Sequence, residues 1–176
     1  MRHIVLLFIP FICTFTQAQD LANADAGDQV KELFEQGERA YRSGAHQEAV
    51  QYYSRVLALD ADHLNAYLQR GFCNSILKDY KAAVKDFSAV IQRKSDHLWA
   101  YTSRGSAYNK LGRHAEAMSD FDRVIALDPR NEEAYNNRGW AKKAMGDAKG
   151  ACKDWKESKK MGNAEAKIIL SNNHCK

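Results

Sequence analysis

The chain has 176 residues, of which 45% are apolar and 27% charged, so it is long enough for one ordinary domain and too apolar to be intrinsically disordered. The formal charge of +4 is spread along the chain, and no run of five or more lysines or arginines marks a nucleic-acid or anionic-lipid surface. We therefore expect no nucleic-acid partner. Only two prolines occur, while alanine, leucine, lysine and glutamate are abundant, which favours an all-α architecture.

The first segment, residues 1–19, has the layout of a secretory signal peptide. Arg2 and His3 precede an apolar run from Ile4 to Phe15, and polar residues follow it. This run of roughly twelve residues is shorter than the roughly twenty that a spanning helix needs, so we expect no membrane span. The expected product is a secreted or periplasmic protein that starts with a short linker, residues 20–29.

The processing of this segment leaves alternatives open. Thr16 and Ala18 are small residues that suit cleavage after Ala18, and cleavage after Gln19 is the other option. Cys13 could carry the lipid of a bacterial lipoprotein, but the bulky Ile12 before it disfavours that interpretation.

A period of 34 residues runs through residues 30–163 and defines the units 30–63, 64–97, 98–131 and 132–163. Each unit has a glycine, then an alanine, then an aromatic residue at fixed spacing, and a large side chain precedes each glycine by one helical turn. The four series are Gly37, Gly71, Gly105 and Gly139; Ala49, Ala83, Ala117 and Ala151; Tyr53, Phe87, Phe121 and Trp155; and Leu33, Tyr67, Tyr101 and Tyr135.

Each unit is predicted to form a helical hairpin, for example with helices over 66–77 and 80–92 and a short polar turn between them. Gly44, Gly112 and Gly146 occupy the matching turn in the other units, where the end of a helix favours left-handed backbone. An interior glycine destabilises a helix by about 1 kcal/mol relative to alanine. Four glycines at one phase therefore indicate that the two helices approach closely, with the aromatic side chain filling the space beside them.

This pattern, which ends in Asp128-Pro129 in the third unit, resembles the tetratricopeptide repeat. The unit "LWAYTSRGSAYNKLGRHAEAMSDFDRVIALDPRN" is similar to the family consensus at nearly all of its defining positions. The resemblance implies an all-α, right-handed superhelical solenoid of four helix-turn-helix repeats whose first helices line a concave groove. It also implies a C-terminal capping helix and tail over 164–176, in which Ile168, Ile169 and Leu170 cover the last repeat.

The three later units share an arginine before the glycine and an aspartate before the aromatic residue, whereas the first unit has Gln36 and Tyr52 at these positions. Because the two residues are present or absent together, we infer that each arginine binds the aspartate of its own unit, since a guanidinium fits a carboxylate bidentately. The predicted structural pairs are Arg70 with Asp86, Arg104 with Asp120, and Arg138 with Asp154.

Three cysteines remain after the expected cleavage, and an odd number leaves a free thiol or an intermolecular bridge. Cys152 lies on the last repeat helix and Cys175 follows the implied cap, so we predict a disulfide between them and a buried free thiol at Cys73. The segment 151–175 also resembles the C-terminal capping segment of bacterial repeat proteins, notably those of the Bacteroidetes, which share this cysteine pair.

The groove implied by the family is the candidate binding site. Its surface would be apolar and rich in amides, and exposed aromatic side chains are typical of binding hot spots. Asn136 and Asn137 would hydrogen-bond the backbone of an extended peptide. The alternative for some of the lining residues, Phe72 and Trp140 especially, is that they pack between adjacent repeats and do not face solvent. The predicted lining is Phe34, Leu68, Phe72, Trp99, Thr102, Ser103, Asn136, Asn137 and Trp140.

One subtype of the family binds the C-terminal carboxylate of chaperones through Lys, Asn and Arg at groove positions. This chain has Phe34 and Glu38 where that clamp needs Lys and Asn, and Trp99 and Ser103 where its later basic residues stand. The resemblance therefore does not imply that ligand.

The sequence shows no catalytic constellation and no ligand set for a metal or cofactor. The histidines follow the repeat, with His46 and His114 at one position and His63 and His97 at another, which indicates packing and turn roles. No phosphate loop, zinc-protease motif or nucleophile elbow occurs. We expect a non-enzymatic, monomeric scaffold for a protein or peptide ligand; the alternatives are an envelope component that associates through its ends or convex face, and a glycan-binding module.

Overall fold

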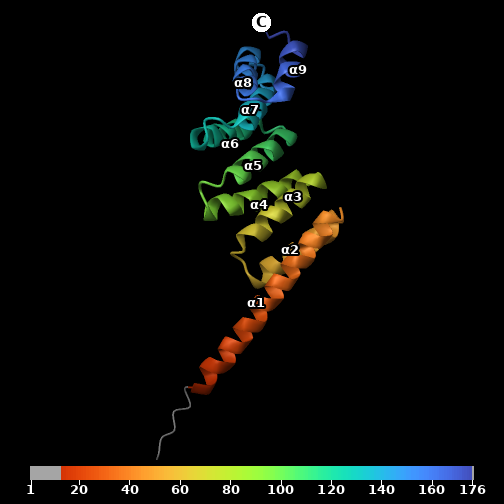
Figure 1. The fold of residues 1–176 in the computed structure, drawn as a ribbon, viewed down its shortest axis with the longest axis vertical. Coiled ribbons are helices and arrows are strands. Elements are labelled where there is room, and N and C mark those ends of the chain that lie inside the picture. Colours follow the sequence, from red (N-terminus) through yellow and green to blue (C-terminus); the bar gives the residue numbers. More distant parts are fainter. Residues whose placement is uncertain (1–12, 176) are drawn as a thin grey trace, which may run out of the picture.

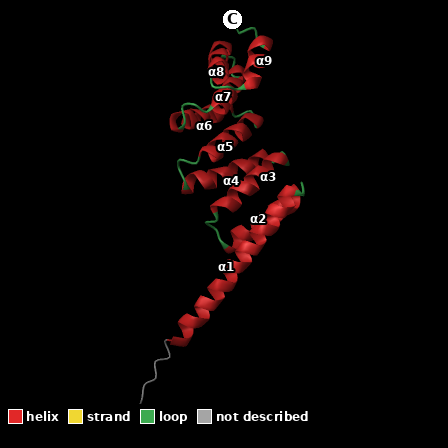
Figure 2. Ribbon diagram, viewed as in Figure 1, coloured by secondary structure: helices red, strands yellow, loops and turns green. Residues whose placement is uncertain are grey.

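The computed structural model describes residues 13–175, with side chains from residue 26 on, so most of the expected signal peptide lies outside the described residues. Within this range the chain is a row of α-helices without strands (Figures 1 and 2). The helices are α1 (Cys13–Arg42), α2 (His46–Leu59), α3 (Leu64–Ile76), α4 (Tyr80–Arg93), α5 (Leu98–Lys110), α6 (His114–Leu127), α7 (Glu132–Ala144), α8 (Ala148–Lys160) and α9 (Ala164–Asn172).

Consecutive helices pack in pairs. The main contacts lie within the hairpins α1/α2, α3/α4, α5/α6 and α7/α8, and the second helix of each hairpin also packs against the first helix of the next. Helix α9 packs against α8, and Figure 1 shows α1 at one end of the row and α9 at the other. The predicted all-α solenoid of hairpins with a C-terminal helix is therefore confirmed.

The N-terminal helix differs from the expectation. A linker is expected from the sequence at residues 20–29, whereas the structure continues one helix from Cys13 to Arg42. Residues 20–29 contain three alanines and no proline, and their one glycine, Gly27, weakens a helix without ending it. The first part of α1 extends beyond α2 in Figure 1.

The core of each hairpin repeats the same contact between a glycine and an aromatic ring. Ala49, Ala83, Ala117 and Ala151 are fully buried beside these rings. A Cβ atom added at Gly37 would lie 2.6 Å from the Tyr53 ring, and one at Gly105 would lie 2.8 Å from the Phe121 ring. These distances are too short for a methyl group, which is the physical reason for a helix-weakening residue at this phase.

The turns and helix starts follow simple chemistry. Gly44, Gly112 and Gly146 end the first helices with φ between 73° and 87°, and Lys78 takes the same left-handed conformation at φ 64° in the second repeat. The first helices of the later repeats, and α9, are capped by a side chain that accepts the backbone N–H three residues on. These caps are His63, His97, Asn131 and Asn163.

The C-terminal helix covers the last repeat through one face. Ile169 is buried and Leu170 packs beside it against Trp155, but Ile168 is 64% exposed. The expectation that Ile168 also covers the repeat is therefore wrong. Ala166, Ile169 and Leu170 share a helical face at spacings of three and four residues, and Ile168 points away from it.

Candidate binding groove

Two first helices, α3 and α5, flank a hollow of about 350 Å³. Phe72 and Ile76 contribute its α3 side, and Trp99 and Ser103 its α5 side. The remaining lining residues are Ser75, Tyr80, Thr102, Ser106, Ala107, Lys110 and Glu133. The hollow thus lies on the surface formed by first helices, as the predicted groove does.

The apolar lining of this hollow is unusually exposed. The side chain of Trp99 is 66% exposed and that of Ile76 is 48% exposed. Phe72 is half-buried because its ring meets the ring of Phe87 edge-on, with centroids 5.4 Å apart. Covering such surface is favourable by about 25 cal/mol per Å², so this hollow favours an apolar ligand group.

A second hollow of about 290 Å³ adjoins the first, because both are lined by Ser106 and Lys110. It also includes Asn137 and Trp140 from α7, and Asn109 and His114 complete its lining. The Trp140 ring contacts the buried Trp155 ring at 5.1 Å between centroids and is still 41% exposed. The two hollows form one groove across α3, α5 and α7.

Of the nine predicted lining residues, Phe72, Trp99, Thr102, Ser103, Asn137 and Trp140 lie on these two hollows, and three do not. Phe34 packs against the rings of Tyr53 and His63. Leu68 packs against the core cluster of Phe87.

Asn136, the third residue, is buried, with only 7% of its surface exposed. Its backbone carbonyl accepts a hydrogen bond from the indole N–H of Trp155 at 3.2 Å. Among the described residues, no group bonds to its side-chain Oδ1. In the structure, Asn137 is therefore the amide that faces the groove, and Asn136 belongs to the packing between α7 and α8.

The Arg and Asp residues of the later repeats form bidentate ion pairs away from the groove. Arg104 donates to Asp120 from Nε at 2.9 Å and from Nη2 at 2.7 Å, and the other two predicted pairs have the same geometry. Burial raises the pKa of Asp120, and the neighbouring guanidinium of Arg104 opposes this effect. Asp86 and Asp120 depend on their arginines for a counter-charge, whereas Asp154 also pairs with Lys142 at 2.8 Å.

Each of these arginines also reaches the preceding repeat, a contact that the sequence analysis missed. Arg70 donates to Ser54 and Arg104 donates to Ser88, both at 3.0 Å, and Arg138 pairs with Asp122. Ser54, Ser88 and Asp122 are spaced 34 residues apart, which is the signal that could have revealed the contact. The arginines therefore join successive repeats as well as the two helices of one hairpin.

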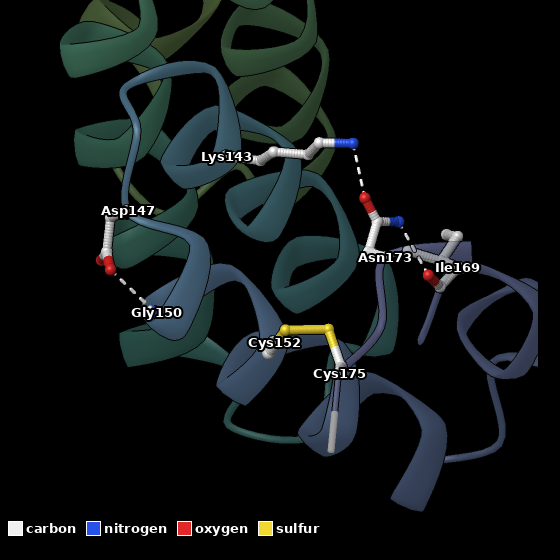
Figure 3. Close-up of a disulfide and its surroundings, with 7 residues drawn as sticks. All are labelled: Lys143, Asp147, Gly150, Cys152, Ile169, Asn173 and Cys175. Carbon is white, nitrogen blue, oxygen red and sulfur yellow. Dashed lines mark hydrogen bonds between the residues drawn. A yellow bond between two sulfur atoms is a disulfide. The ribbon is translucent and has the colours of Figure 1, made fainter. Parts of the chain in front are cut away.

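The C-terminal cysteines meet beside the cap. In the structure, Cys152 on α8 and Cys175 after α9 are joined, with Cα atoms 5.5 Å apart (Figure 3). Asn173 holds the same tail, because its side chain donates to the carbonyl of Ile169 at 2.7 Å and accepts from Lys143. Cys73 is a buried free thiol whose pKa is raised to about 11 by burial, so it is a poor nucleophile.

Within residues 26–175 we find no group of three or more His, Cys, Asp or Glu side chains placed to hold a metal ion. None of the helices in the described range has the length and apolar character needed to cross a membrane.

Models of two repeat families match the chain: "Tetratricopeptide repeat" over residues 64–97 and "TPR repeat" over residues 105–146. Searches of curated proteins give no match.

Several solved structures have a similar fold. The crystal structure of MamA is 23% identical, with a TM-score of 0.74, and the match covers 85% of this chain and 86% of that one. MamA from Desulfovibrio magneticus RS-1 (41-end) is 23% identical over 75% of each chain, with a TM-score of 0.73. The first TPR of Spaghetti (RPAP3), bound to the HSP90 peptide SRMEEVD, is 26% identical, with a TM-score of 0.64, and covers 68% of this chain and 94% of that one. By its repeats and by its fold, this chain is a tetratricopeptide-repeat protein.

Proposed function

We propose that this chain is a non-enzymatic protein-interaction scaffold that holds an extended segment of a partner protein in the groove across α3, α5 and α7. The observation that carries the proposal is the hollow beside Trp99, whose side chain is 66% exposed. Covering a solvent-exposed tryptophan on a concave surface contributes strongly to the free energy of binding, and such residues dominate binding energies. The similar RPAP3 domain holds a peptide in its own structure.

The lining of the groove indicates the chemistry of the segment. Phe72, Ile76 and Trp99 form an apolar wall, and Ser103 and Ser106 add hydroxyl groups that can bond a peptide backbone. Lys110 and Glu133 are the charged residues that line the first hollow. We therefore expect a segment with one large apolar anchor and little net charge.

The HSP90 peptide SRMEEVD, which has three acidic residues, is a poor candidate for this groove. The positions where the chaperone-binding subtype has basic residues are Phe34, Trp99 and Ser103 in this chain. Without those cations, the carboxylates of such a peptide would lose water without gaining a charged partner.

A displayed library of random peptides, selected on the purified protein, tests this proposal. Binding of the selected peptides would be measured by fluorescence anisotropy for the wild type, for Trp99→Ala and for a control, Leu59→Ala. Leu59 is also an exposed apolar residue, 48% exposed, but it lines neither hollow. We expect Trp99→Ala to weaken binding at least about 30-fold, as for a hot-spot residue, and Leu59→Ala to leave it unchanged.

Equal effects of the two substitutions would place binding outside the groove and refute the proposal. A protein that selects no peptide, but binds a glycan in a manner that depends on Trp99 and Trp140, would instead support the glycan-binding alternative.

We also propose that the protein is secreted or periplasmic. The signal-like residues 1–19 and the adjacent cysteines 152 and 175 support this location, because disulfides persist in oxidising compartments. Mass spectrometry of the protein from its native host tests the proposal: a mature chain that starts near residue 19 or 20 is expected, and an intact Met1 would contradict it.

A further inference from the structure

The two ends of the solenoid carry opposite charges. Residues 142–176 contain nine lysines and four acidic residues, whereas residues 20–38 contain six acidic residues and one lysine. Figure 1 places α1 at one end of the row and α8 and α9 at the other. The basic charge of the chain is thus concentrated at its C-terminal end, although no consecutive basic run marks it.

Four exposed lysines form a stripe along one face of α8. Lys149, Lys153, Lys156 and Lys160 follow one another at three or four residues, so they lie on one side of the helix over about 16 Å. Of the same positions in α4, only the first two are lysines, Lys81 and Lys85. The same positions in α2 and α6 contain no lysine; they are Gln47, Gln51, Ser54 and Ala58, and Ala115, Ser119, Asp122 and Ala126. The repeat fold therefore does not require this lysine stripe.

The lysine stripe borders a hollow of about 520 Å³ between α8 and the C-terminal tail. The tail is held there by the link between Cys152 and Cys175 (Figure 3). Among the described residues that line the hollow, Glu157 is the one acidic side chain. Glu157 already pairs with Lys160 at 2.7 Å. Lys149 and Lys153 lie one helical turn apart and repel each other, so a negatively charged occupant would relieve this repulsion.

The shape and composition of this hollow favour an acidic helix over other anions. Single-stranded nucleic acids are bound by stacking on several aromatic rings, and the described lining contains no Phe, Tyr or Trp; its one ring is the imidazole of His174. A bilayer is flat and is bound by surfaces that also insert large apolar side chains, whereas this site is hollowed and has four lysines and no large apolar side chain among its ten lining residues. An acidic helix presents carboxylates at the same spacing of three and four residues.

Such an acidic helix face exists at the other end of this chain. Asp28, Glu32 and Glu35 are exposed and lie on one face of α1, and we call them the acidic stripe. Arg39, one turn further along this face, lies 3.9 Å from Glu35 and marks the end of the stripe. The opposite face of α1 contains the buried Leu33 and Ala40. The acidic stripe therefore points away from the solenoid.

We propose that the lysine stripe of one molecule binds the acidic stripe of a second copy of this chain, head to tail. The two surfaces differ, so each bound copy leaves one end of each kind free, and the association does not close at a dimer. Because the charges are exposed, the attraction falls steeply as salt shortens the screening length. The groove takes no part in this contact.

Charge reversal tests the proposal by light scattering coupled to size exclusion, on the purified protein at about 20 mM and about 500 mM salt. At low salt we expect the average mass of the wild type to rise with concentration, and at high salt we expect a monomer. Lys149→Glu with Lys153→Glu should abolish the association, as should Glu32→Lys with Glu35→Lys. Mixing these two monomeric variants should restore the contact as a 1:1 dimer, because each supplies the one stripe that the other lacks.

The matched control is Lys81→Glu with Lys85→Glu, which makes the same change at the equivalent exposed positions of α4. This variant should associate like the wild type, and circular dichroism should show equal helicity for all variants. A wild type that stays monomeric at low salt overturns the proposal. It is also overturned if the control variant dissociates as fully as the α8 variant, or if mixing the two reversed variants restores nothing.

Discussion

The first and last hairpins have the same backbone fold but are stabilised by different side-chain contacts. In the last hairpin Asp154 pairs with both Arg138 and Lys142, and the hydroxyl of Ser158 donates to the backbone of Glu132 at 2.8 Å. In the first, Gln36 replaces the arginine and donates only to Glu32 on its own helix. The first hairpin is therefore held mainly by apolar packing.

This difference distinguishes the contacts that form a hairpin from the contacts that stabilise it further. The glycine, alanine and aromatic contacts are common to both ends, so they suffice for the hairpin. The ion pairs add stability and join neighbouring repeats. Because each repeat of a solenoid contacts only its neighbours, we expect local stability to increase from α1 towards α8, with unfolding starting at the N-terminal end.

The largest expected effect is that of Arg104→Ala. Its removal leaves the buried Asp120, whose side chain is 5% exposed, without a counter-charge, so we expect a loss of about 3–5 kcal/mol in the free energy of unfolding. Arg138→Ala should be milder, because Lys142 still contacts Asp154 at 2.8 Å. Gln36→Ala should stay within about 0.5 kcal/mol of wild type. Urea unfolding followed by circular dichroism measures all three, and equal effects would remove the distinction between the two ends.

Breaking the link at the C-terminus should make that end resemble the first hairpin. A disulfide between residues 23 apart stabilises by about 3 kcal/mol through loop closure, so Cys175→Ser should destabilise the cap by about that amount. Hydrogen exchange should become faster in α9 and α8 and stay unchanged in α1 and α2. Peptide mapping that finds Cys175 reduced in the native protein would count against this prediction.

The glycine contact should show no difference between the ends. We expect both Gly37→Ala and Gly139→Ala to destabilise by about 1–3 kcal/mol, because the new methyl group would overlap Tyr53 or Trp155. Gly27→Ala is the control: its surroundings are open, so the better helix former should be neutral or stabilising. Thermal unfolding compares the three, and a harmless Gly139→Ala would refute the close contact.

Acid should weaken the start of α5 selectively. His97 caps α5 by accepting a backbone N–H at Nδ1, which protonation prevents, whereas Asn131 caps α7 at any pH. Burial lowers the pKa of His97 from 6.5, so its contribution to stability is present above pH 6.5 and is lost as the pH falls through the lower folded value. We expect an effect below about 1 kcal/mol. His97→Asn should flatten this part of the stability profile; an unchanged profile would argue against the cap.

The smallest effect is expected for Tyr53→Phe. The phenol oxygen of Tyr53 is buried without a hydrogen-bond partner among the described residues, and burial raises its pKa. Phe87 and Phe121 fill the same position in the next repeats without a hydroxyl. The substitution should therefore change the free energy of unfolding by no more than about 0.5 kcal/mol, or increase it. A clear destabilisation in urea would reveal a partner for this hydroxyl.

The fold was predictable because the same residue types recur at equivalent positions of several repeats. Gly105 alone says little, but a glycine at the same phase of four units, followed by Ala117 and Phe121 or their equivalents, leaves few alternatives to a packed hairpin. Helix α1 was harder to predict, because residues 20–29 lack an apolar face. The part of a helix that projects beyond the core needs no apolar face, so the sequence pattern does not mark it.

The candidate site was predictable only in part. The position of a residue on a helical face does not tell whether its side chain lines the groove or is buried against another helix. Trp99 and Asn136 both lie on first helices, yet Trp99 is exposed and Asn136 is buried beside Trp155 of its own hairpin. The difference depends on which part of the first helix the neighbouring helices cover, and the periodicity of a single helix does not reveal this. The lysine stripe escaped detection for a related reason: Lys149, Lys153 and their neighbours are adjacent on a helix surface and separated in sequence.

The contact between each arginine and the preceding repeat also bears on how such a chain can lengthen. If residues 98–131 were duplicated in tandem, the arginine of the new copy would meet Asp122 of the old one, as Arg138 does now. Arg138 would then contact the copied aspartate, so the arginine at every junction between repeats would keep its polar partner. Gene duplication can thus insert whole units without a compensating mutation, and the element that ends the series is α9, which has no second helix after it in the described chain.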